Sequence, residues 1–143
     1  MSAAEANKQI VRRFFAEVCN GRQLAVAKEL FSTGHVFHDP SLPGVADGPE
    51  GIVADNGPVV AYQRAFSDAH WSVEDMIADG DTVVTRWLGT GTQDGELAGI
   101  PANGKSVHVA GIWIQRLDDG KIVESWDVWD TFGMLKQLGA IPG

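Results

Sequence analysis

The chain has 143 residues, of which 44% are hydrophobic and 21% charged, and this fits one soluble globular domain over residues 1–143. Its formal net charge of −8 at pH 7 argues against nucleic acid or an anionic membrane surface as a partner, because like charges repel. The single cysteine, Cys19, excludes an internal disulfide, and no segment resembles a signal peptide or a membrane span, so we expect a cytoplasmic protein.

Two helices are predicted at the start of the chain. Ser2 and Glu5 can form a capping box, and apolar residues recur at helical spacing as far as Gly21. Cys19 lies on this first helix, where packing is its expected role. A second helix is expected over residues 24–31, and Gly34 should end it.

The next segment should be mostly irregular. Residues 35–39 predict a short strand that Pro40 ends. Residues 41–58 hold three of the six prolines and several glycines, which predicts a long surface loop. A third helix is expected over residues 59–66.

Four strands and a helix are predicted in the second half, over residues 71–78, 82–92, 106–117, 122–129 and 131–138. Asp79 and Gly80 form a good hairpin signal between the first two strands. Asp130 precedes the final helix, where its side chain should cap free backbone N–H groups. Helices followed by an antiparallel meander predict an α+β fold, with the helices covering one face of the sheet.

The last two strands carry apolar residues on both faces. An antiparallel sheet with one wet face should instead alternate apolar and polar side chains. One face should line a pocket beneath the helices. No further helices remain for the other face, so we expect it to bury against a second copy of the chain, in a homodimer. Trp126 belongs to this second face.

Asp127 is the leading candidate for chemistry. Side chains alternate along a strand, so Asp127 shares a largely apolar face with Ser125 and Trp129. Burial there disfavours the charged carboxylate and raises its pKa, which suits a general acid or base near neutral pH. The alternative is an edge-strand aspartate that pairs with an arginine or with solvent.

Several segments, in a consistent order along nearly the whole chain, resemble those of one family: Ala6–Phe15, His38-Asp-Pro40, Ala78–Trp87, Gly99–Lys105 and Gly120–Asp127 with the Leu135-x-x-Leu-Gly139 helix after it. They are similar to the SnoaL-like polyketide cyclases of the NTF2-like fold group. The resemblance implies a cone-shaped fold in which N-terminal helices cover a curved antiparallel sheet.

The resemblance also implies an activity. In such cyclases the aspartate at the position of Asp127 removes a proton from a carbon flanked by carbonyls and returns one to the new hydroxyl. The reaction is an intramolecular aldol condensation on an aromatic or polyketide-like compound. It needs no cofactor and no metal, because the delocalised enolate is already moderately stable.

Other residues extend the candidate site. His38 is expected at the mouth of the helix layer, as a donor or proton shuttle. Trp113 and Trp129 should share the pocket face with Asp127, together with Ser125 and Phe37, and a flat aromatic substrate would stack there.

Two further sets of residues leave alternatives open. Arg86, if buried, would pair with Asp127 or Glu124, which would lower the pKa of the carboxyl group and weaken its role as a base. His35, His38 and Asp39 are potential metal ligands, but the set lacks a third well-spaced partner on a rigid element.

The chain departs from the family pattern around Asp127. Positions that are polar in characterised cyclases hold Gly111 and Trp113, and Ser125 and Gln93 stand where histidine is common. Two alternatives to cyclisation follow. One is a polyketide hydroxylase of the same fold that works without a cofactor, and the other is a small-molecule-binding protein without turnover.

Overall fold

A computed structural model describes residues 1–142. Its elements, in chain order, are α1 (Ala3–Arg13), η1 (Phe14–Asn20), η2 (Leu24–Val26), α2 (Ala27–Leu30), β1 (Phe31–His38), α3 (Pro49–Ile52), α4 (Val60–Ala65), β2 (His70–Asp79), β3 (Thr82–Thr92), β4 (Ser106–Asp118), β5 (Lys121–Trp129) and α5 (Thr131–Gln137). The four strands and the final helix predicted in the second half are confirmed to within one or two residues.

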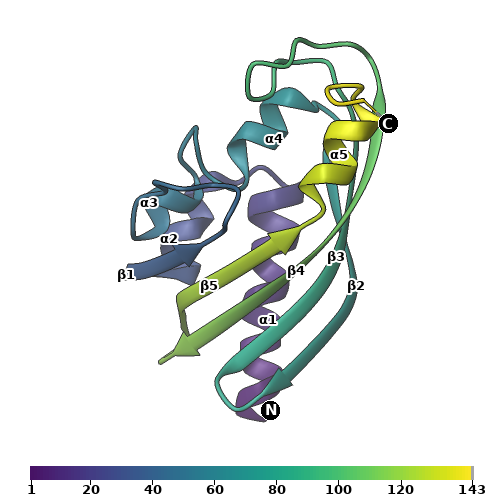
Figure 1. Cartoon of the computed structure of the whole chain (residues 1–143). Helices are drawn as coiled ribbons and strands as arrows, with labels where there is room; N and C mark the ends of the chain where they lie inside the picture. The colour runs from purple at the N-terminus through teal and green to yellow at the C-terminus, as the bar shows by residue number, and fades with distance from the viewer. Residues whose placement is uncertain (143) are drawn as a thin grey trace.

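The strands form one five-stranded sheet in the order β1-β5-β4-β3-β2. β2 to β5 pair as an antiparallel meander, and β1 adds to β5 in parallel. Figure 1 shows that the sheet is curved, that α1 runs behind it, and that α4 and α5 lie together at one end. The predicted α+β arrangement, with helices on one face of the sheet, is confirmed.

The first helix is held in place by its cap and by its buried face. Ser2 accepts a hydrogen bond from the backbone of Glu5 at 3.1 Å, which satisfies a free N–H group at the helix start. The chain then continues into the π-helical segment η1 without a break, and the buried side chains there are Phe14, Phe15, Val18 and Cys19. The packing role expected for Cys19 is confirmed. Asp130 also caps α5 as predicted, since it accepts from Gly133 N at 2.8 Å.

The second predicted helix is shorter than expected. It ends at Leu30, and the chain then runs extended from Phe31 to His38 as β1. The free edge of β5 explains the difference, because pairing with it supplies the backbone hydrogen bonds that a helix would otherwise supply. The predicted loop over residues 41–58 also contains one short helix, α3.

The face of the sheet away from the helices exposes large apolar side chains. The exposed fraction is 63% for Val128, 45% for Ile112 and 39% for Ile114, and Trp126 and Ile77 lie on the same face. Within one chain the inner face of β4 and β5 is therefore buried, and the apolar side chains of the outer face are exposed. None of the helices within residues 1–142 is long and apolar enough to cross a membrane.

Candidate active site

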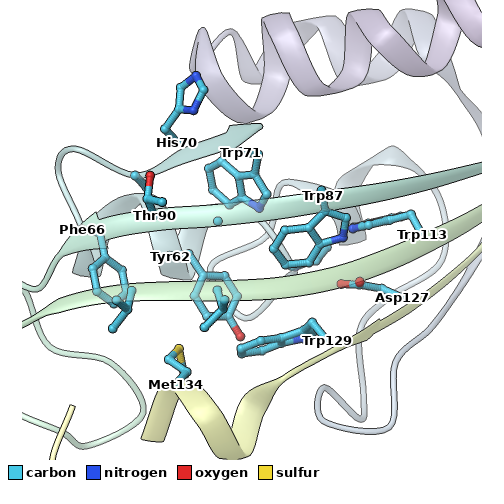
Figure 2. A pocket seen from close by; sticks show the side chains of 15 residues that line it. Tyr62, Phe66, His70, Trp71, Trp87, Thr90, Trp113, Asp127, Trp129 and Met134 are labelled. Atoms are coloured by element: carbon cyan, nitrogen blue, oxygen red, sulfur yellow. The ribbon is translucent and has the colours of Figure 1, made fainter. Parts of the chain in front are cut away.

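A pocket lies between the inner face of the sheet and the helices α4 and α5. About 500 Å³ of space unfilled by atoms lies within its lining, a figure that includes the open solvent at its mouth. Its lining is dominated by aromatic side chains, among them the four tryptophans Trp71, Trp87, Trp113 and Trp129 (Figure 2). Such a pocket suits a flat, largely apolar ligand that stacks on aromatic rings.

Asp127 is the only carboxylate that lines this pocket within the described residues. It is 4% exposed, and it lies directly across from Trp113 on β4. Its Oδ1 is buried and has no hydrogen-bond partner. Burial raises the pKa of Asp127 well above its ordinary value, and the nearby Asp39 raises it further through its charge and a shared hydrogen bond. The group is thus set up to hold and release a proton.

Asp39 lies close to Asp127, whereas the sequence indicated it only as a potential metal ligand. It follows β1, and its Oδ1 accepts hydrogen bonds from the backbone and the hydroxyl of Ser41 at 2.8 and 2.7 Å. Its Oδ2 accepts one from the indole Nε1 of Trp129 at 3.2 Å. The groups of Ser41 and Trp129 are all donors, which suits a carboxylate, since a carboxylate only accepts hydrogen bonds. Two carboxyl groups in unlike surroundings are a common basis for acid–base chemistry.

His38 does not lie in the pocket, so its predicted catalytic position is wrong. Its ring is exposed, stacks on Trp126, and bonds the Glu124 carboxylate at 2.8 Å. Trp126 and Glu124 lie on the outer face of the sheet, which is the face away from the helices. The alternation along β1 explains this, because His35, Phe37 and Asp39 point inward and His38 points outward.

Arg86 also lies away from the pocket, so its predicted place there is wrong. It is exposed on β3, and the flanking residues Thr85 and Trp87 are the ones that point inward. It therefore does not pair with Asp127, and the arginine-paired alternative for Asp127 is removed. The alternation of β3 leaves Arg86 on the outer face of the sheet.

The remaining candidates fall into two groups. Trp113 and Trp129 line the pocket beside Asp127. Phe37 packs against Trp113, with ring centroids 5.5 Å apart, and Ser125 is fully buried next to it on the sheet; both stand outside the pocket lining. Phe37 and Ser125 therefore lie next to residues of the pocket without lining it.

Ser125 takes part in a buried polar chain. Its hydroxyl lies 2.8 Å from Nε2 of His35 and 3.3 Å from Nε2 of Gln115. Burial is the main cause that lowers the pKa of His35 to about 4, so the ring is neutral at physiological pH. His35 thus lies inward while His38 lies outward, and they do not form a common metal site. No cluster of three potential metal-ligating side chains occurs within residues 1–142.

Comparisons with known proteins point to one family. The family model described as SnoaL-like polyketide cyclase matches residues 9–138. The aklanonic acid methyl ester cyclase DnrD of Streptomyces peucetius is 31% identical over 135 residues, which cover 91% of this chain and 88% of DnrD.

Solved structures agree with the fold of the chain. TsrD from Streptomyces laurentii superposes with a TM-score of 0.85 at 26% identity, covering 99% of this chain and 100% of TsrD. IdmH from Streptomyces antibioticus gives a TM-score of 0.80 at 28% identity, covering 93% of this chain and 98% of IdmH. The NTF2-like architecture expected from the sequence is confirmed.

Proposed function

The chain belongs to the SnoaL-like polyketide cyclase family, and on that premise we propose that it closes a ring by an intramolecular aldol reaction. The substrate is a polyketide-like carbonyl compound with an acidic C–H between carbonyls. Asp127, as the carboxylate, removes this proton and leaves an enolate. The enolate carbon attacks a second carbonyl carbon, and protonated Asp127 then gives its proton to the new alkoxide. Atoms and charge balance without a cofactor.

The placement of Asp127 carries this proposal. A carboxyl group that is 4% exposed, with one oxygen unpaired, lowers the stability of the fold. Groups of this kind occur most often where they take part in catalysis. The pocket contributes orientation, because stacking on Trp113 and Trp129 holds a flat substrate against Asp127.

The substrate class follows from the pocket and from the relatives. DnrD, with 31% identity, is an aklanonic acid methyl ester cyclase. The aromatic lining of the pocket and its one carboxyl group support a carbonyl compound that can stack on aromatic rings. We therefore take aklanonic acid methyl ester as the first substrate to test.

The test incubates the purified protein with aklanonic acid methyl ester and follows the products by mass spectrometry. We expect a cyclised product of unchanged mass. A product heavier by one oxygen would favour the hydroxylase alternative. Quenching of tryptophan fluorescence without any product would favour the binding-protein alternative. Each of these two results contradicts the proposal.

Removing the charge of Asp39 should change the pH dependence of activity. Burial keeps the pKa of Asp127 high in Asp39→Asn, but the contribution of the second carboxylate is lost, so the pKa falls. Below its pKa, Asp127 is protonated and cannot act as the base. The acid limb of kcat/KM should therefore move to lower pH in the variant.

The control for this experiment is Asp79→Asn, which removes an exposed charge at the far end of β2. Its kcat/KM profile should match that of the native chain. If the acid limb of Asp39→Asn stayed in place, or moved to higher pH, Asp39 would not tune Asp127. Full pH profiles for the three proteins, measured at constant ionic strength, decide the point.

The exposed apolar face of the sheet supports a second proposal, a homodimer. Its apolar centre is the cluster Ile112, Ile114, Trp126 and Val128 on β4 and β5. Arg116 and Glu124 lie on the same face, 3.3 Å apart, and Arg86 is close by on β3. A face that carries both charges is complementary to itself, as a twofold interface requires.

Light scattering tests the dimer directly. At micromolar concentration the protein should show twice the 15.3 kDa mass of one chain. Val128→Arg places a charge in the apolar centre and should yield monomers, while Asp79→Asn should remain dimeric. A native chain that scatters as a monomer would contradict this proposal.

A further inference from the structure

Trp87 lies across two strands of the sheet because its neighbours lack side chains. A Cβ atom built on Gly111 of β4 would come within 2.3 Å of Cζ2 and 2.5 Å of Cε2 of Trp87. A Cβ atom on Gly89 of β3 would come within 3.0 Å of Cζ3. The indole therefore fills the space above both glycines and reaches from β3 over β4 toward β5.

The ring orientation follows from these contacts. The Cε3–Cζ3 edge faces Gly89, and Nε1 is on the opposite edge of the indole. Nε1 therefore faces the next row of inward residues, in which Thr85, Trp113 and Asp127 are paired across β3, β4 and β5. Figure 2 shows the nitrogen-bearing edge of Trp87 on the side of the pocket where Trp113 and Asp127 lie.

Among the described residues that line the pocket, two carry a buried polar side-chain atom without a hydrogen-bond partner. Trp87 is 5% exposed and its Nε1 makes no hydrogen bond, while Asp127 is 4% exposed and its Oδ1 makes none. Both residues line the same pocket. Buried polar groups in folded proteins are nearly always paired, so an occupant of the pocket is expected to pair with them.

The two groups are complementary to one kind of ligand. An indole N–H is a neutral group that only donates, and Asp127 exchanges a proton. A carbonyl oxygen accepts from the donor while the acidic C–H beside that carbonyl faces the carboxylate. When Asp127 removes this proton, negative charge develops on the carbonyl oxygen, next to the N–H group.

On this basis, and resting on the proposed function, we propose that Trp87 is a further catalytic residue. Its indole N–H binds the substrate carbonyl beside Asp127 and stabilises the enolate oxygen by a hydrogen bond that strengthens as charge develops. Gly111 permits this role, because only a residue without a side chain leaves room for the ring.

Trp87→Phe tests the role in catalysis, since it removes the N–H group and keeps an aromatic ring. We expect kcat to fall about 100-fold, as for the loss of one oxyanion donor, with KM changed only a few-fold. The acid limb of the pH profile should stay in place, because Trp87 carries no charge. Trp71→Phe removes an indole from the same pocket on β2 and should cost far less. Equal losses in the two variants, or a kcat within twofold of the native value in Trp87→Phe, would overturn the proposal.

A second measurement does not depend on the folding of a Trp87 variant in the assay. In Asp127→Asn, aklanonic acid methyl ester should bind without turnover, and the indole N–H proton signal of Trp87 should shift downfield as it donates to the carbonyl. Binding that moves other signals but leaves this one in place would overturn the role of Trp87 alone. Absence of both binding and native turnover would contradict the proposed function, and the role of Trp87 with it.

Discussion

Replacing Asp127 with asparagine is expected to lower turnover of aklanonic acid methyl ester by at least ~100-fold, the usual scale for the loss of a general acid or base. Asparagine has the shape of the protonated acid but cannot exchange a proton at neutral pH. The side chain is buried opposite Trp113, so its shape matters for packing, and the substitution preserves it. Substrate binding should therefore survive, with quenching of tryptophan fluorescence at concentrations close to those for the native chain.

Two observations separate this result from simple damage to the fold. The circular dichroism spectrum of Asp127→Asn should match that of the native protein. Asp79→Asn, which changes an exposed aspartate in the same way, should keep native turnover. Native-like turnover in a correctly folded Asp127→Asn protein would remove Asp127 from the mechanism.

Asp127→Asn should also change the free energy of unfolding, and the size of this change should depend on pH. The pKa of Asp127 is raised in the folded state, chiefly by burial and then by Asp39. The stability linked to its protonated form is fully present below the unfolded aspartate pKa of about 3.9, and it is lost as pH rises through the folded pKa. The asparagine side chain carries no titrating group, so Asp127→Asn does not lose this stability as pH rises. Above the folded pKa it should therefore be more stable than the native chain, by about 1.4 kcal/mol for each unit of pKa elevation.

Urea unfolding of both proteins at a series of pH values measures this difference. The two stabilities should differ least near pH 4 and diverge as pH rises, with the asparagine variant ahead. For a chain of this size, 1 kcal/mol corresponds to about 2–4 °C in Tm, so thermal scans should follow the same trend. A difference between the proteins that does not vary with pH would mean that Asp127 titrates as it does in the unfolded chain.

The second half of the chain could be predicted well because its signals are local. Alternating side chains and the Asp79-Gly80 turn fix the strands and the hairpin, and the boundaries of β3 match the prediction residue for residue. The region before it depended on distant partners. Residues 27–31 have a helical pattern, but Phe31 joins a strand because the edge of β5, which lies about ninety positions later in the chain, is free to pair with it.

In the candidate site, too, local patterns place some residues correctly, while others depend on contacts between distant parts of the chain. Alternation on β5 and the pairing of β4 with β5 correctly place Asp127, Trp113 and Trp129 together. The same rule, applied to β1 and β3, would have placed His38 and Arg86 on the outer face. Both side chains are exposed on that face, although their chemistry suits an active site.

Other features of the site have no signal in the sequence alone. Asp39 lies near Asp127 only because β1 adds to β5, and Trp129 donates to it only in the folded chain. The reach of Trp87 over Gly111 depends on the register between β3 and β4 and on the angle of one ring. Gly111 is visible in the sequence, but the ring that fills the space above it becomes known only from the folded structure.

The pKa of Asp127 is the measurement that bears most directly on its role as acid and base. Carboxyl-carbon NMR titration of the native chain, with Asp127→Asn to assign the signal, gives this value without any substrate. A titration midpoint well above the ordinary aspartate value of about 3.9 is the predicted result. A midpoint at or below that value would mean a solvated or charge-paired carboxylate, and would contradict a desolvated acid and base at the centre of the pocket.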